Sequence, residues 1–157
     1  FEIINYYINK YKPNVLFHGF TTKNFKKEIK NNFKYNIHFG ILYLFKSLYV
    51  TPAFTCRRDL LEKVGGYNEN IRYAEDIDLY IKLRKLSNFF FVNNVLVKIS
   101  SKSERVNNPD HLSSNVLLMR KSINNIFLSQ IYPLNFKSLF FLFALITNIL
   151  KSSLERI

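Results

Sequence analysis

The chain of 157 residues is long enough for one ordinary domain with a core, and its 48% hydrophobic and 22% charged residues exclude a disordered protein. Its single cysteine, Cys56, excludes an intramolecular disulfide and a thiolate metal cluster. The net charge of +12 favours anionic partners, a class that includes nucleotide diphosphates, lipid phosphates and nucleic acid.

The N-terminal part of the chain predicts a helix, a strand and a basic segment. Apolar residues at helical spacing predict a helix over Phe1–Tyr11 that Pro13 ends, and the apolar run Asn14–Phe20 predicts a strand. Lys23–Lys34 carries five lysines and one acid. It is either a solvated loop or helix face, or a basic rim facing a membrane or an anionic acceptor. The apolar segment Ile37–Val50 is either a buried helix or a loop-helix over an acceptor site.

The middle of the chain predicts a short strand followed by two helices. The small residues of Thr51–Cys56 indicate the strand, and Arg57–Val64 is predicted as a helix that stops at Gly65. A polar loop follows. Leucines at positions 79, 83 and 86 then have the i, i+4, i+7 spacing of a buried stripe, which predicts a second helix over Glu75–Leu86.

Two carboxylates of this second helix are predicted to face opposite sides. At 100° per residue Asp76 shares the face of Leu79 and Leu83, whereas Asp78 lies roughly 200° away on the wheel. Asp78 is therefore expected in water, paired with Lys82 at i, i+4 for roughly 0.3 kcal/mol. Because a polar loop precedes them, these two aspartates are not interpreted as the strand-terminal D-x-D of a nucleotide-metal site.

The rest of the sequence predicts a strand pair and helices. Phe89–Val92 and Val95–Ile99 flank Asn93-Asn94, which can support a tight turn between two strands. His111–Ile131 has the apolar spacing of a long helix. The apolar run Leu139–Ile146 is too short to cross a bilayer as a helix. It is either part of a core helix or a helix that lies in a membrane interface.

The resemblance of this chain to a known family rests on residues 51–86, which read TPAFTCRRDLLEKVGGYNENIRYAEDIDLYIKLRKL. This segment resembles the acceptor-side motif of family 2 glycosyltransferases of the GT-A fold. That family combines a small-residue strand, an Arg-rich helix start, V-G-G-[FY]-[DN]-E, and E-D-x-D-L at a helix start. The match continues through FFFVNNVLVKIS and covers about half of the chain. It implies an α/β fold in which residues 1–100 are the acceptor-side half of a GT-A (Rossmann-like) domain. Residues 101–157 are then a C-terminal helical extension, available for membrane association.

The resemblance also implies an activity and assigns roles to residues. The activity is inverting glycosyl transfer from a nucleotide sugar to a glycan or lipid-linked acceptor, with Mg²⁺ or Mn²⁺ as cofactor. Asp76 is then the catalytic base, and Glu75 positions it or contacts the acceptor. Arg57 and Arg58 are expected to approach donor phosphates or an anionic acceptor. The paired glycines at 65 and 66 complete the substrate-binding set, although the residues alone indicate a turn there.

Two departures from the family pattern shape these expectations. The sequence contains no D-x-D at the end of an apolar strand, so the chain is expected to begin just after that motif and to need a donor-binding half for activity. The second strand ends in Lys98-Ile99-Ser100 where the family often has an aromatic-Arg-His run, which leaves His111 as the only candidate metal-binding histidine.

The competing expectation is a non-catalytic remnant or a basic interaction module. Either is expected in the cytoplasm or on the inner face of the cell membrane, and nucleic-acid binding is not expected because no such motif is present.

Overall fold

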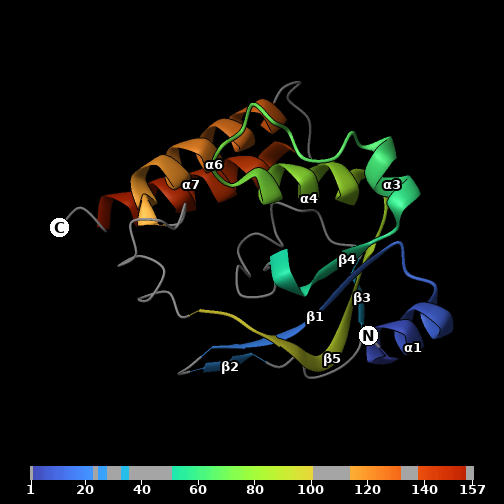
Figure 1. Ribbon diagram of the computed structural model, residues 1–157. Coiled ribbons are helices and arrows are strands. Elements are labelled where there is room, and N and C mark those ends of the chain that lie inside the picture. The colour runs from blue at the N-terminus through green and yellow to red at the C-terminus, as the bar shows by residue number, and fades with distance from the viewer. Residues whose placement is uncertain are drawn as a thin grey trace. The chain divides into compact units, whose positions relative to one another are not determined.

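The computed structural model describes residues 2–22, 25–27, 33–35, 51–100, 114–131 and 138–154 (Figure 1). The expectations for Ile37–Val50 and for His111 fall outside these residues. In the described part of the chain the fold is α/β, and it forms two compact units. The first unit holds the sheet and includes residues 82–100, while the second holds residues 67–81 and the C-terminal helices.

One mixed sheet with the strand order β2-β1-β5-β3 organises the first unit. Its strands are β1 (Val15–Thr22), β2 (Phe25–Lys27), β3 (Phe33–Tyr35), β4 (Phe54–Cys56) and β5 (Phe89–Lys98). β1 pairs in parallel with β5, and β3 pairs antiparallel with β5. β4 pairs antiparallel with the first residues of β1 and β2 with its last residues, so the two short strands share one edge of β1.

The centre of this sheet is buried on both faces, which explains the unbroken apolar sequence of β1. Neighbouring residues of a strand point to opposite faces, and both Leu16 and Phe17 are at most 1% exposed. The ring centroid of Phe17 lies 5.2 Å from that of Phe91, 5.4 Å from Phe89 and 5.3 Å from Phe54. Parallel strands are usually covered on both sides and therefore lack a polar alternation.

The Asn93-Asn94 pair does not form the predicted turn between two strands. β5 runs through it as a single strand, and its register with β1 shifts there: His18 pairs with Val92, but Gly19 pairs with Val95. An asparagine pair fits either a tight turn or a bulge. The parallel pairing with β1 requires β5 to continue in one direction, so the two residues are accommodated as an irregularity within the strand. The prediction of two strands here was wrong.

The described residues of the basic segment Lys23–Lys34 are strands, which differs from the predicted loop or helix face. The segment contains β2 and the first residues of β3. Lys26 is paired with Thr21 of β1, and Lys34 is paired with Phe90 of β5. Strand edges present unpaired backbone groups that another segment can satisfy. The pairing partners of β2 are the neighbouring residues of β1, whereas those of β3 lie in the distant strand β5. Neither pairing is visible in a lysine-rich pattern.

The predicted N-terminal helix is confirmed as α1 (Glu2–Tyr11). It packs on the sheet through aromatic rings and one half-buried hydrogen bond. The ring centroids of Tyr11 and Phe90 are 4.7 Å apart, and the Tyr7 hydroxyl donates a 2.7 Å hydrogen bond to Asn94 Oδ1. The bulge residue Asn94 therefore also serves to attach α1 to the sheet.

Residues 51–86 fold in the predicted order. A 3-10 turn, η2 (Thr51–Ala53), leads into β4, and α3 (Arg58–Lys63) follows. The second helix, α4, spans Glu75–Leu86 as predicted.

The second unit contains two antiparallel helices, α6 (Val116–Ile131) and α7 (Ser138–Leu154), which lie side by side (Figure 1). The predicted C-terminal helices are thus confirmed within the described residues. Phe127 of α6 packs on Phe141 of α7, with ring centroids 5.9 Å apart. Among the described helices, none combines the length and the apolar content needed to span a membrane.

Candidate functional site

The glycine pair after α3 ends the helix, as the sequence predicts. Gly65 and Gly66 have φ angles of +78° and +63°, in the left-handed region that favours glycine. The Gly65 N–H donates to Glu62 O (3.1 Å) and the Gly66 N–H to Leu61 O (3.0 Å), the bond pattern of a Schellman stop. A Cβ at either position would meet nothing within 4 Å. The requirement for glycine therefore comes from the backbone angles and not from lack of space.

The two arginines at the start of α3 are held by acids of their own segment. Arg57 forms a bidentate pair with Asp59, with N–O distances of 2.7 and 3.0 Å, and Nη1 donates to Asn14 Oδ1 at 3.2 Å. Hydrogen bonding to Arg57 lowers the pKa of Asp59. Arg58 pairs with Glu62 at 2.8 Å in i, i+4 spacing. All these pairs are exposed, so a phosphate approaching either arginine would have to compete with an existing carboxylate.

Cys56 precedes these arginines and has the character of a structural thiol. Burial, and then the charge of Asp59, raises the pKa of Cys56 to about 11. Its Sγ lies 3.3 Å from the Arg57 carbonyl oxygen, to which it donates. A thiol that stays protonated at neutral pH is a poor nucleophile and a poor metal ligand.

The turn that carries Glu75 and Asp76 contains a strained residue. Ala74, directly before Glu75, is buried at 3% exposure and has φ +59°. A non-glycine residue in this region costs roughly 1–2 kcal/mol. The Ile77 N–H donates both to Ala74 O (3.0 Å) and to Asp76 Oδ1 (2.9 Å). Strain of this kind persists where the surroundings impose it, and it is concentrated at functional sites.

Ser122 of α6 anchors this turn from a distant part of the chain. Its hydroxyl donates a 2.6 Å hydrogen bond to the carbonyl oxygen of Tyr73, the residue before Ala74. Both residues belong to the second unit. Sequence reasoning missed Ser122 because no local pattern connects positions 49 residues apart.

The charges of Glu75 and Asp76 also act on Tyr67, a residue that was not predicted as part of the site. Burial, followed by the charges of Asp76 and then Glu75, raises the pKa of Tyr67. Asn68 turns the chain back after it: Asn68 Oδ1 accepts the Asn70 N–H at 3.1 Å. Tyr67 is still 43% exposed. The signal in the sequence that could have identified Tyr67 is its position, because it is the aromatic residue that follows the two glycines.

The helical wheel placed Asp78 incorrectly. Asp78 is only 8% exposed, and the next three residues, Leu79, Tyr80 and Ile81, are at most 2% exposed. Four consecutive buried residues cover a full turn, so this part of α4 is buried all round and has no solvent face. Leu86, counted in the buried stripe, is instead 49% exposed at the helix end. Asp76, expected at the edge of the buried face, is half-buried.

The residues described here do not form a site for the Mg²⁺ or Mn²⁺ that the resemblance implies. Within the described ranges, no group of three or more His, Cys, Asp or Glu side chains could hold a metal ion. Glu75 and Asp76 supply two carboxylates and lack a third donor of these types in that part of the chain. No metal-dependent step is therefore assigned to them.

Comparisons of the chain with family models, with curated proteins and with solved structures found no match. The interpretation of the site consequently depends on the motif order in residues 51–86 and on the geometry around Glu75, Asp76 and Tyr67.

Proposed function

We propose that the chain is the acceptor-side part of an enzyme that transfers a sugar, with inversion, from a nucleotide sugar to a glycan or lipid-linked acceptor. The order of strand, arginine helix, glycine stop and acidic helix start in residues 51–86 supports the proposal. The observation that carries it is the strained turn at Ala74, directly before Glu75 and Asp76. Burial, and then the charges of these two carboxylates, raise the pKa of Tyr67.

In this proposal Asp76 accepts the proton of the acceptor hydroxyl as that oxygen attacks the anomeric carbon. A positioned base of this kind contributes about 10²–10⁴-fold to the rate. Glu75 contacts a second acceptor hydroxyl or orients Asp76. The pKa of Tyr67 is raised from an ordinary value of 10.0, so its phenol is protonated at neutral pH and its O–H can donate a hydrogen bond to an acceptor oxygen. Ser122 and Ala74 act as positioning residues by fixing the backbone of the turn.

The test compares Asp76→Asn with Glu69→Gln in the enzyme that contains this chain. Glu69 is an exposed acid of the same loop and serves as the matched control. We expect Asp76→Asn to lower the transfer rate by about 10²–10⁴-fold, measured as nucleoside diphosphate released in the presence of acceptor. The control should keep the rate. A fully active Asp76→Asn enzyme with an unchanged melting temperature would rule out the base assignment.

A second readout examines the geometry without any activity. Because the negative charge of Asp76 contributes to the raised pKa of Tyr67, the Asn variant should lower that pKa toward its ordinary value. The measurement is the phenolate absorbance titration of each protein, with its Tyr67→Phe counterpart subtracted. An unchanged Tyr67 titration would contradict the proximity of the phenol to Asp76.

A second property, peripheral membrane association, is favoured by one face of α7. Six large apolar side chains on this helix are each 39–58% exposed: Leu139, Leu142, Phe143, Ile146, Ile149 and Leu150. Their spacing is that of a single stripe along the helix. The other face of α7 packs on α6 through Phe141 and Asn148. The stripe is therefore separate from the contact between the two helices.

The positive charge of the chain favours an anionic lipid surface as the partner of this stripe. Neither α6 nor α7 contains an acidic residue, and the whole chain carries a net charge of +12. A second copy of the chain would bring the same positive charge and be repelled. An amphipathic helix in the plane of the interface buries its apolar face about 5–10 Å deep. The proposed location is therefore the inner face of the cell membrane.

Vesicle flotation at low salt tests this location. We expect binding to vesicles containing anionic phosphatidylglycerol and much weaker binding to neutral phosphatidylcholine vesicles. The double variant Phe143→Ser with Ile146→Ser should weaken binding at least roughly tenfold, since each side chain contributes about 1.5–3 kcal/mol on burial. Leu86→Ser, an equally exposed apolar position on α4, is the control. The proposal would be excluded if the folded protein did not bind anionic vesicles, or if it formed a dimer that buries the stripe.

A further inference from the structure

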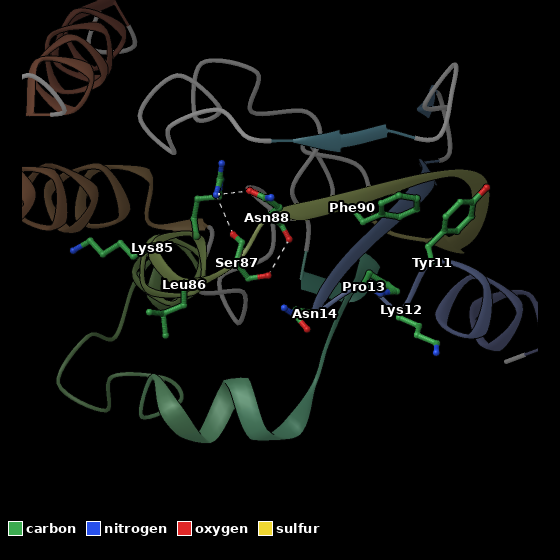
Figure 2. Close-up of a pocket in the computed structure, with 10 residues that line it drawn as sticks. Tyr11, Lys12, Pro13, Asn14, Lys85, Leu86, Ser87, Asn88 and Phe90 are labelled. Atoms are coloured by element: carbon green, nitrogen blue, oxygen red, sulfur yellow. Dashed lines mark hydrogen bonds between the residues drawn. The ribbon is translucent and has the colours of Figure 1, made fainter.

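A pocket of about 550 Å³ lies at the last turn of α4, whereas the acidic turn (Tyr73–Asp76) leads into its first turn (Figure 2). Figure 2 shows Lys85 directed away from the rest of the lining and Lys12 on the side of Tyr11. The cations of the lining therefore do not meet at one point. The lining belongs to the first unit and the acidic turn to the second. The pocket is assigned no ligand and no part in the candidate site.

Within the second unit, one amide side chain of α7 contacts α6 at two positions. Asn148 Oδ1 accepts a 2.8 Å hydrogen bond from Arg120 Nη1. Asn148 Nδ2 donates to Asn124 Oδ1 at 2.8 Å and to the Arg120 carbonyl oxygen at 3.4 Å. Asn148 is only 1% exposed. Because its two partners are four residues apart, the amide spans about 6 Å along the axis of α6.

Ser122 lies midway between these two positions and on the other side of α6. At 100° per residue Ser122 is about 200° around the helix from Arg120, whereas Asn124 is only about 40° from it. The Ser122 hydroxyl donates a 2.6 Å hydrogen bond to the carbonyl oxygen of Tyr73. All these residues belong to the second unit. Helix α6 thus has α7 on one side and the acidic turn on the other.

The polar contacts of Asn148 fix the position of α6 along α7 in a way that the apolar contact does not. Phe127 and Phe141 pack with ring centroids 5.9 Å apart, and apolar packing has little directionality. Hydrogen bonds instead weaken steeply with distance and angle. A shift of α6 by one residue would move Ser122 by about 1.5 Å along the axis and turn it by about 100°. Its hydrogen bond to the acidic turn would then be lost.

The acidic turn depends on a contact of this kind because its backbone is strained. Ala74 follows Tyr73 and has φ +59°, an angle that residues other than glycine rarely adopt. Strained backbone persists only where the surrounding structure imposes it. Glu75 and Asp76 come directly after Ala74, so a relaxed turn would redirect both carboxylates.

We propose that Asn148 is a remote positioning residue of the candidate site. Through Arg120 and Asn124 it sets the position of α6, and Ser122 then holds the acidic turn in its strained form. The inference rests on the proposed function, in which Asp76 is the base. Its geometric part, the dependence of the turn on an amide of α7, can be measured without any sugar transfer.

The test compares Asn148→Ala, Ser122→Ala and the double variant by the phenolate absorbance titration of Tyr67, with each Tyr67→Phe counterpart subtracted. Both single variants should lower the pKa of Tyr67 toward 10.0, because a relaxed turn weakens the burial and the carboxylate charges that raise it. The double variant should titrate like Ser122→Ala alone, since Asn148 acts through Ser122. Asn124→Ala removes one partner of the amide and is the milder variant, with a smaller shift in the same direction.

Phe141→Leu is the matched control. It weakens the same helix interface through its apolar contact and leaves the polar contacts in place. It should lower the melting temperature and leave the Tyr67 titration unchanged. Three results would overturn the proposal: an equal Tyr67 shift in Phe141→Leu and Asn148→Ala, additive shifts in the double variant with Ser122→Ala, or no shift in any folded variant.

In the enzyme that contains this chain, Asn148→Ala should lower kcat by up to about 10²-fold, because a misplaced base loses its alignment with the acceptor hydroxyl. The KM for the nucleotide sugar should stay the same. If Asp76→Asn abolished transfer and Asn148→Ala kept the full kcat, Asn148 would not position the base. A fully active Asp76→Asn enzyme would instead remove the base assignment, and the Tyr67 titration would still decide whether Asn148 holds the turn.

Discussion

The centre of the sheet and the interface between α6 and α7 are both buried, but their chemistry differs. In the sheet, Phe17 is surrounded by the rings of other phenylalanines. Between the helices, Arg120 is 8% exposed and donates a 2.8 Å hydrogen bond to Asn148, which donates in turn to Asn124 at 2.8 Å. Apolar packing stabilises in proportion to the area buried and has little directionality. A buried polar network instead fixes one register, and it loses stability whenever one member is removed.

The largest effect is expected in the apolar centre. Phe17→Ala should lower the free energy of unfolding by about 3–5 kcal/mol, because it removes a fully buried ring and leaves a cavity. Denaturant titration measures the loss. Phe17→Leu keeps most of the apolar volume and should cost much less. If the two variants were equally destabilised, the size of the side chain would not be the source of stability here.

In the polar interface between α6 and α7, changing both partners of a hydrogen bond should cost less stability than changing one of them. Asn148→Ala removes the acceptor of the Arg120 Nη1 hydrogen bond and should cost about 1–3 kcal/mol. Replacing the two together, Arg120→Met with Asn148→Leu, removes both polar groups and should recover much of that loss. A double-mutant cycle by thermal melting gives the coupling between them. Strictly additive losses would mean that the network contributes no coupling energy.

The buried carboxylate of α4 extends this comparison into the candidate site. Asp78→Asn is expected to lower stability by about 1–3 kcal/mol, because it replaces a carboxylate that is only 8% exposed and that interacts with other residues of the folded chain. This replaces the small effect that the wheel predicts for an exposed ion pair. Asp76→Asn, at a half-buried position, should change the melting temperature less. Melting curves of the two variants test this expectation. A larger loss of stability in Asp76→Asn than in Asp78→Asn would contradict the deeper burial of Asp78.

Cys56 provides the smallest effect, and it depends on pH. Its pKa in the folded chain, about 11, lies above the ordinary value of 9.0. The folded state therefore holds the thiol proton more tightly, and this contribution to stability is complete below pH 9.0 and lost as the pH rises toward about 11. At pH 9.0, iodoacetamide should label the urea-unfolded chain faster than the folded one. Equal rates would show that burial does not protect the thiol.

Several elements were determined by the sequence alone, because their causes are local. The apolar spacing and Pro13 predict α1, and the apolar run from Asn14 predicts β1. The acid pair Glu75-Asp76 and the leucines that follow it predict α4 over its observed range. Gly65 marks the end of α3 since the left-handed angle that stops a helix favours glycine. Each of these signals lies within a few residues of the feature it predicts.

Other features depend on partners far away in the chain. Asn93-Asn94 became part of one strand because β1 pairs with β5 in parallel, and the same residues would suit a turn in another setting. The wheel could not reveal the burial of Asp78, since that depends on how many sides of α4 are covered. Ser122 reaches the turn at Tyr73 only after folding. Local patterns carry backbone preference and periodicity, whereas burial and long-range hydrogen bonds are decided by the tertiary structure that brings the partners together.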